Sequence, residues 1–271
     1  MSRKRIRLAA LVCTVAMIAA VPASAEAKKI ITISGSTSVF PLETKLARAW
    51  IKTKKGKKFA FKISQGGSNV GVSDVSKGRV SIGASSRDPA TGDPGGLVFT
   101  KISRDALCVI TNNANQLPNI TKARVRSIFV NGPGDWGAIP GATVGGTITA
   151  IGRAPTSGTH DAFRSLFLDG TNQASYVAGK ASNGLVQQGV IGDPQAIGYA
   201  SLAFQQGVHV VSYEGVECSL RNAIAGTYGG TRNFWFVTQG APTGGVKKFI
   251  GWILKSKRAD TIIRSEWVPL R

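Results

Sequence analysis

The sequence contains very little histidine and cysteine, two and three residues respectively among 271. The histidines, His160 and His209, lie far apart, and no His/Cys/Asp/Glu spacing typical of a metal site occurs. The G-x-S-x-G motif of serine hydrolases is absent as well. Ser157, His160 and Asp161 are the residue types of a hydrolytic triad, but residues so close in sequence rarely converge in that geometry. We therefore expect neither an enzyme, nor a metal site, nor a cofactor.

Long hydrophobic runs are also absent, apart from one at residues 8–21. A membrane-spanning helix needs about 20 apolar residues, so this run is short. It follows a basic segment at residues 3–7 and precedes small residues at 23–27, the arrangement of a cleaved signal peptide. Cys13 lies inside the run and not at the cleavage point, which argues against a lipid anchor. We expect residues 1–27 to direct export to the periplasm or the cell exterior, with a retained membrane anchor as the alternative.

Acidic residues are scarce. The chain has 14 Asp and Glu against 34 Lys and Arg, a formal net charge of +20, and +17 remains without residues 1–27. This excess indicates an anionic ligand, partner or neighbouring surface. Much of it lies in one lysine-rich segment between a helical pattern and a strand pattern, which we interpret as a solvated turn: Lys52, Lys54, Lys55, Lys57 and Lys58.

A nucleic-acid-binding protein is the alternative that this charge supports, and it rests on the charge alone. Phe40, Trp50, Phe59 and Phe61 occupy periodic apolar positions. Aromatic side chains in such positions are typical of a core and not of a base-stacking surface. We therefore expect no nucleic-acid partner.

Two cysteines, Cys108 and Cys218, remain in the exported chain. An oxidising compartment favours a disulfide between them, which would close a loop of about 110 residues. Cys108 also lies in an apolar strand pattern at residues 106–110, as a buried free thiol would. The sequence leaves both interpretations open.

The rest of the chain alternates short apolar strands with Gly/Ser/Thr turns and amphipathic helices, a rhythm typical of the α/β class. Strands predicted at 30–33, 59–63, 80–83 and 147–151 each run into such a turn. The third turn ends at Arg87, and Arg153 precedes the fourth.

These four turns share one chemistry. Glycine lets backbone N–H groups approach a ligand, and a following helix N-terminus offers unpaired donors and a favourable dipole. Ser and Thr hydroxyls add short donors, and Arg153 adds a bidentate charged contact. Each turn alone is typical of an ordinary helix cap, but the four together favour an anion-binding site.

At these turns the chain resembles the phosphate-binding proteins of ABC-type phosphate importers. The resemblance begins at residues 35–42 (GSTSVFPL) and continues through residues 65–68 (QGGS) and 82–87 (IGASSR). Residues 105–112 (DALCVITN) resemble the strand that crosses between lobes in that family. Further matching segments extend it over nearly the whole exported chain: residues 128–136, Arg153 with 157–163, 196–199 and 226–238.

This resemblance implies a two-lobed, hinged periplasmic-binding-protein fold of type II that holds phosphate between its lobes and delivers it to an importer permease. It implies a monomer, with lobe I at residues 28–112 and 204–271 and lobe II at 113–203. A C-terminal amphipathic helix with Phe249, Trp252, Ile253 and Ile263 would pack on lobe I. We call the ligand-binding residues that the resemblance implies the cradle: Thr37, Ser38, Ser68, Ser86, Arg153, Ser157, Gly158 and Thr159.

One cradle position departs from the family pattern. Well-known members carry an Asp, which accepts the phosphate proton, where this sequence has Ser86. Asp88 and Asp161 are the candidate substitutes. The departure leaves sulfate and molybdate as alternative ligands, and scavenging or sensing without a transporter as an alternative role.

Overall fold

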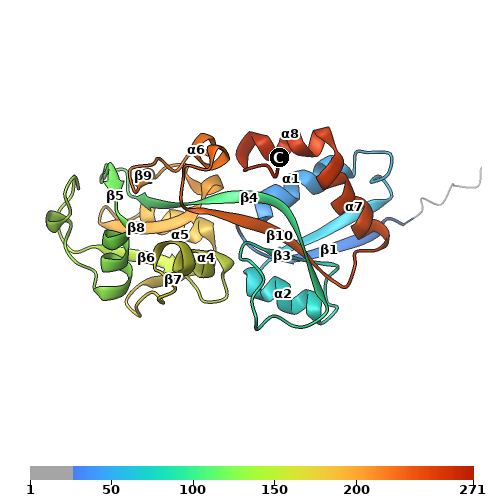
Figure 1. The fold of residues 1–271 in the computed structure, drawn as a ribbon, viewed down its shortest axis with the longest axis horizontal. Helices are drawn as coiled ribbons and strands as arrows, with labels where there is room; N and C mark the ends of the chain where they lie inside the picture. Colours follow the sequence, from blue (N-terminus) through green and yellow to red (C-terminus); the bar gives the residue numbers. More distant parts are fainter. Residues whose placement is uncertain (1–26) are drawn as a thin grey trace, which may run out of the picture.

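The computed structural model describes residues 27–271, so the predicted signal peptide, except for its last residue, lies outside the described residues. The main strands are hydrogen-bonded in the order β2-β1-β3-β10-β4-β8-β6-β7, and β9 joins β4 to β5 (Figure 1). The strands are β1 (Lys29–Gly35), β2 (Phe59–Gln65), β3 (Ile82–Ser85), β4 (Leu97–Thr111), β5 (Asn119–Ile120), β6 (Thr149–Arg153), β7 (Ala178–Lys180), β8 (Ala196–Ser201), β9 (His209–Tyr213) and β10 (Thr231–Gln239).

The helices cover the sheet on both sides. In Figure 1, α1, α7 and α8 lie on one side of the strands β1 to β3, and α2 lies on the other. At the other end of the sheet, α4 and α5 pack against β6 and β8. The helices are α1 (Phe40–Trp50), α2 (Ser68–Ser76), α3 (Lys122–Arg126), α4 (Gly158–Phe167), α5 (Asn183–Ile191), α6 (Leu220–Ala225), α7 (Gly244–Lys255) and α8 (Lys257–Glu266).

The C-terminal helix predicted from Phe249 to Ile263 is in fact two helices. Ser256 separates α7 from α8 with extended backbone angles, φ −88° and ψ 128°. Phe249, Ile253 and Ile263 are all buried in one cluster with the core side of α1. The periodic pattern therefore identified the buried faces correctly, but no glycine or proline marks the break.

β4 and β10 are the two long strands that run through the middle of the molecule (Figure 1). They pair antiparallel over their lengths, from Thr231 opposite Ala106 to Gln239 opposite Leu97. The second half of β4 then pairs with β8 and β9. The two strands therefore connect both ends of the sheet without a break.

The buried side chains form two main clusters, and the structure is two-lobed in this sense. One cluster draws its residues from 31–102 and 234–267, and the other from 106–228 together with Val268. Residues 204–228, which we expected in lobe I, contribute Val208, Val211 and Tyr228 to the second cluster. We therefore propose lobe boundaries near residues 105 and 231, and we use lobe I and lobe II in that sense below.

Cys108 and Cys218 are joined by a disulfide, with their Cα atoms 5.6 Å apart. Both cysteines are buried in lobe II, where the bridge ties the second half of β4 to the segment before α6. The sequence left open a disulfide or two buried free thiols, and the structure contains the disulfide.

Candidate anion-binding site

The four predicted turns follow β1, β2, β3 and β6 and meet where these strands end. β1 pairs in parallel with both β2 and β3, so the three carboxyl ends lie at one edge of the lobe I sheet. The turn after β6 reaches the same place from lobe II: the backbone N–H of Asn69 donates to the carbonyl of Thr156 at 3.2 Å. The turns therefore face one another across the two lobes.

Within lobe I, three serine hydroxyls link the turns. Ser36 donates to Ser86 at 2.9 Å, and the hydroxyls of Ser86 and Ser68 lie 3.3 Å apart. The backbone N–H of Ser86 donates to Ser68 Oγ at 3.0 Å. All three serines are buried. The predicted residues Ser68 and Ser86 are thus in direct contact, and Ser36, which the sequence analysis did not assign to the site, extends the chain of hydroxyls from Ser86.

Other cradle residues meet directly across the lobes. The hydroxyls of Ser38 and Thr159 lie 2.9 Å apart, although 121 positions separate them in sequence. Arg153 donates through Nη2 to Thr37 Oγ1 at 3.1 Å. The lobes are therefore closed on each other at the cradle.

Gly158 lies against Ser68 at the same contact. A Cβ atom at position 158 would lie 2.3 Å from Ser68 Oγ and 3.0 Å from the backbone nitrogen of Arg87. Only glycine fits at this distance. The neighbouring Ser157 caps α4 by accepting from the backbone N–H of Thr159 at 3.1 Å.

Arg153 is the cationic residue that the sequence placed in the cradle, and its side chain is almost fully buried. It donates through Nε to the carbonyl of Lys180 at 3.1 Å and through Nη2 to that of Ala181 at 3.0 Å. Its Nη1 is buried without a hydrogen-bond partner among residues 27–271. Burial lowers the pKa of Arg153 to about 10, so the guanidinium stays charged at neutral pH.

Arg232 is a second buried cation at the site, which the sequence analysis did not assign. Its Nη1 donates to Thr159 Oγ1 and its Nη2 to Ser38 Oγ, both at 2.9 Å. On its other edge it pairs with Asp105, through Nε at 3.0 Å and Nη2 at 2.8 Å. Asp105 is fully buried in β4, and an acid is almost never fully buried unless it is paired.

Burial acts on both members of this pair. It raises the pKa of Asp105 and lowers the pKa of Arg232, and the attraction between the two charges opposes both effects. Ser201 donates to the remaining oxygen of Asp105 at 2.9 Å. Both carboxylate oxygens are thus engaged, one by Arg232 and the other by Ser201.

Asn183, at the start of α5, was also not predicted. Its side-chain N–H groups donate to Thr37 at 3.0 Å and to Ser38 at 2.8 Å, and its carbonyl oxygen accepts from the backbone N–H of Ser201. Asparagine is common where helices begin, so the sequence carried no signal that distinguished Asn183 from an ordinary residue at a helix start.

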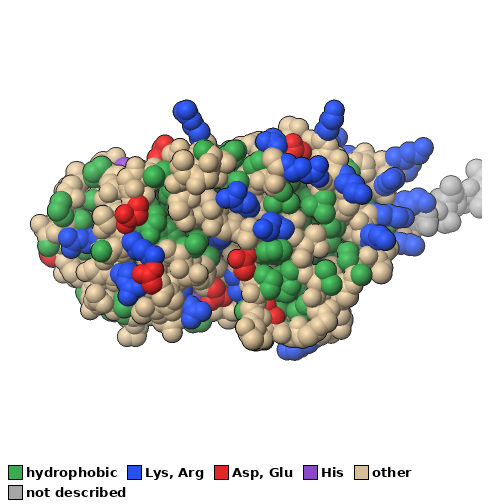
Figure 2. All heavy atoms as spheres, in the orientation of Figure 1, with side chains coloured by type: hydrophobic (Ala, Val, Ile, Leu, Met, Phe, Trp, Pro, Cys, Tyr) green, Lys and Arg blue, Asp and Glu red, His purple; other side chains and the backbone are tan. Residues whose placement is uncertain are grey.

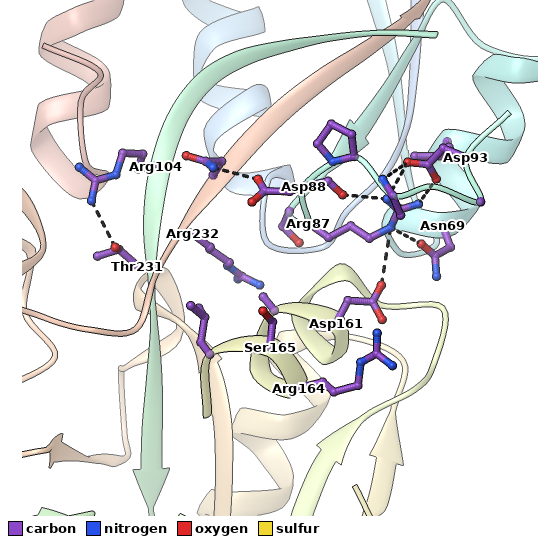
Figure 3. A pocket seen from close by; sticks show the side chains of 18 of the residues that line it. Asn69, Arg87, Asp88, Asp93, Arg104, Asp161, Arg164, Ser165, Thr231 and Arg232 are labelled. Atoms are coloured by element: carbon purple, nitrogen blue, oxygen red, sulfur yellow. Dashed lines mark hydrogen bonds and ion pairs between the residues drawn. The ribbon is translucent and has the colours of Figure 1, made fainter. Parts of the chain in front are cut away.

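Asp88 and Asp161 are the candidate substitutes for the acid that Ser86 replaces, and both bind residues other than the cradle hydroxyls. Asp88 accepts from Asn233 and Trp235 at 2.8 and 2.9 Å. Asp161 lies 3.6 Å from Arg87. Both carboxylates line a pocket that adjoins the cradle, and Figure 3 shows Arg87 reaching towards Asp161 there.

This pocket is a groove of about 820 Å³ between the lobes. Ser86 and Arg232 line both the groove and the cradle, so the groove adjoins the buried hydroxyls. Arg104 and Arg164 lie on its walls, from β4 and α4 respectively (Figure 3). The groove also carries Asp88, Asp93 and Asp161, so its four arginines exceed its acids by one charge.

No group of three or more His, Cys, Asp or Glu side chains that could hold a metal ion occurs among residues 27–271. The donors at the site are instead hydroxyl, amide and guanidinium groups. Such a set suits an anion, since each of these groups can donate a hydrogen bond to it.

A family model described as a PBP superfamily domain matches residues 20–257. The chain belongs to this superfamily. Among curated proteins, it is 26% identical to the phosphate-binding protein PstS of Bacillus subtilis, over 89% of this chain and 80% of that protein. It is 24% identical to PstS of Borreliella burgdorferi, over 87% of this chain and 88% of that protein.

Solved structures of the superfamily resemble this chain closely. A phosphate ABC transporter substrate-binding protein from Clostridium perfringens, solved with bound phosphate, superposes with a TM-score of 0.83 at 27% identity. That match covers 90% of this chain and all of the other. An ABC-type phosphate transport receptor from Vibrio cholerae gives a TM-score of 0.70 at 25% identity, over 88% and 99% of the two chains. The predicted two-lobed α/β fold is confirmed.

Proposed function

We propose that this chain captures inorganic phosphate between its two lobes and delivers it to the permease of an ABC importer. Two observations support this proposal. The relatives at similar length are phosphate-binding proteins, and one solved relative holds phosphate. The cradle brings neutral hydroxyl donors and buried arginines together where the lobes meet.

In this proposal lobe I supplies Thr37, Ser38, Ser68 and Ser86, and lobe II supplies Arg153, Ser157, Gly158 and Thr159. Arg232 and Asn183 join them, because both donate to cradle hydroxyls. Within the structure, the observation that carries the proposal furthest is Arg153 Nη1, a buried cationic donor without a partner among the described residues. A bound oxyanion would supply the acceptor that this donor lacks.

Binding and release need the lobes to separate, because Ser38 and Thr159 are buried and in contact. β4 and β10 connect the lobes as a pair, with a register shift between Phe234 and Trp235 close to the lobe boundary. We propose that the molecule opens about this pair in a hinge motion.

We further propose that the mature protein works in the periplasm or at the cell exterior. The leader predicted at residues 1–27 and the disulfide between Cys108 and Cys218 support export into an oxidising compartment. Among residues 27–271, none of the helices is both long enough and apolar enough to cross a membrane. We expect binding without turnover of the ligand.

Calorimetric titration of the mature protein with phosphate, sulfate and molybdate between pH 5 and 8 tests the ligand. We expect saturable binding of phosphate. Ser86 provides no carboxylate to accept a phosphate proton, so we expect weaker discrimination against sulfate than a member with the acid would show. Absence of saturable binding for all three anions would overturn the proposal, and a preference for sulfate or molybdate would reassign the ligand.

Arg153→Ala tests the site. We expect the variant to lose about 100-fold or more in phosphate affinity, because a desolvated anion loses its charged partner. Arg258→Ala, which removes one exposed charge from α8, is the matched control and should bind as the original protein does. If Arg153→Ala and Arg258→Ala bound phosphate equally well, the anion would bind at a site away from Arg153.

A further inference from the structure

The net charge of the molecule is confined to one lobe. Residues 27–104 and 232–271, which form lobe I, carry 23 Lys and Arg and six Asp and Glu. Residues 105–231, which form lobe II, carry seven of each. The excess of +17 therefore belongs entirely to lobe I, and the phosphate site, which both lobes share, does not account for it.

Much of this excess lies at the end of lobe I farthest from the cradle. Lys29 begins β1, and its backbone N–H donates to the carbonyl of Lys58 at 3.0 Å, which brings two segments of the chain together. Figure 2 shows blue side chains gathered at this end, where the chain enters the fold. We call the exposed lysines here the lysine face: Lys28, Lys29, Lys52, Lys54, Lys55, Lys57, Lys58 and Lys62.

The lysine face has no acidic counterpart in its own segments. Within residues 27–73 the one acid is Glu43, and its side chain is buried. Glu43 therefore offers no exposed partner to these lysines. Their field is not cancelled locally, so it extends into solvent over about a Debye length.

The turn that carries five of these lysines is built into the fold and is not a loose tail. Thr53 Oγ1 donates to the carbonyl of Trp50 at 2.7 Å and accepts from the backbone N–H of Gly56 at 3.0 Å. A Cβ at Gly56 would lie 2.0 Å from the carbonyl oxygen of Trp50, so the turn packs directly on the end of α1. The Phe59 ring lies 5.1 Å from the Trp50 ring beneath it. The charges are thus held on one surface.

We propose that the lysine face docks lobe I onto the surface of a membrane rich in anionic phospholipid. The five cations of the turn at residues 52–58 are all lysines, compact point charges on flexible stems that suit a plane of headgroups, whereas specific reading of phosphates and bases favours arginine. Trp50 and Phe59 are buried under the turn and cannot stack on bases. Ile30, 64% exposed among the lysines, adds an apolar contact.

The position of the face agrees with such docking. The predicted leader, with its apolar run at residues 8–21, directly precedes Lys28, so this end of the domain is nearest the bilayer during export. The first cradle residue, Thr37, follows the opposite end of β1, about 20 Å away for a seven-residue strand. Docking therefore leaves the groove between the lobes open to solvent.

Vesicle flotation of the mature protein tests the proposal, with vesicles of phosphatidylcholine alone and of phosphatidylcholine mixed with phosphatidylglycerol. We expect binding only to the mixed vesicles and a steep loss as salt is raised. Changing Lys52, Lys54, Lys55, Lys57 and Lys58 to Gln should reduce partitioning at low salt by about 1,000-fold or more, since each lysine near an anionic surface contributes roughly fivefold.

A matched control removes five exposed charges of lobe I outside the face, so that both variants have the same net charge: Lys77, Arg79, Lys255, Lys257 and Arg258, all to Gln. This control should keep most of the partitioning. An equal loss in both variants would overturn the proposal, and so would tighter binding of duplex DNA than of the mixed vesicles at the same salt. Phosphate titration of both variants tests the cradle separately, and we expect it unchanged.

Discussion

Asp105 accepts two hydrogen bonds from Arg232, and through this arginine it supports the contact between the lobes. The two residues are direct cross-strand partners in the β4–β10 register, at the lobe boundary. The outer nitrogens of Arg232 donate to Ser38 of lobe I and Thr159 of lobe II. A carboxylate that touches neither hydroxyl thus positions the cation that touches both.

Asp105→Asn should leave Arg232 buried without a counter-charge. We expect the anion-free protein to lose about 3–5 kcal/mol of unfolding free energy, because an uncompensated buried charge is costly. Phosphate bound in the cradle would supply the missing negative charge. Phosphate should therefore raise the melting temperature more in the variant than in the original protein, and equal shifts would show that Asp105 does not act on the cradle through Arg232.

Gly158→Ala should obstruct closure of the lobes. The added Cβ would lie 2.3 Å from Ser68 Oγ across the site, so one lobe has to shift. We expect phosphate affinity to fall by about 10- to 100-fold, equivalent to 1–3 kcal/mol of overpacking, with little change in unfolding free energy. Gly251→Ala on α7, whose Cβ would meet nothing within 4 Å, should leave the affinity intact. Calorimetric titration of both variants with phosphate measures the two affinities. An unchanged affinity in Gly158→Ala would contradict the prediction.

Cys108→Ala with Cys218→Ala should destabilise the protein by about 3–5 kcal/mol, because the bridge closes a loop of 110 residues in the unfolded chain. Urea unfolding under non-reducing conditions measures the loss. A reductant should lower the stability of the original protein by a similar amount and leave the double variant unchanged. If a reductant also lowered the stability of the double variant, its effect would not come from the disulfide between Cys108 and Cys218.

Glu43 should make the protein less stable as pH rises. Burial raises its pKa from an ordinary 4.5 to about 8, and neither carboxyl oxygen has a partner among the described residues. Below about pH 4.5 the group is protonated in both states, and its contribution to stability is fully present. Between pH 4.5 and 8 only the unfolded state releases the proton, so unfolding free energy falls by about 1.4 kcal/mol per pH unit.

Glu43→Gln should remove this part of the pH dependence and stabilise the protein at pH 8 relative to the original chain. Glu217→Gln changes an exposed acid and serves as the control. Denaturant unfolding at pH 5 and pH 8 gives the comparison. The same slope with pH in the Glu43 variant and the original protein would show that Glu43 does not hold its proton in the folded state.

The local signals in the sequence predicted the turns of the site well. Each turn follows a strand and precedes a helix or another turn within a few residues, and the chemistry of Gly, Ser and Thr needs no tertiary contact to be recognised. Thr37, Ser38, Ser68, Ser86, Arg153, Gly158 and Thr159 all lie where the turns meet, although their role in binding phosphate stays a prediction. The lysine-rich turn is also exposed as expected.

The residues that the sequence did not assign depend on pairings between distant segments. Arg232 and Asp105 lie 127 positions apart and meet only because β4 and β10 pair antiparallel in one register. The lobe boundaries that we propose from the buried clusters differ from those expected from the sequence, because β4 runs through both lobes as one strand of 15 residues with no turn signal near residue 105.

By itself, the sequence determined the chemistry of this protein: hydroxyl and glycine turns at strand ends, one arginine beside them, and an excess of positive charge. These properties belong to single residues and short segments, so they are present before folding. Only the tertiary structure decided that Ser38 meets Thr159, that Asp105 holds Arg232, and that the whole excess charge lies on one lobe. Each of these depends on strand order and register, which many weak long-range contacts set together.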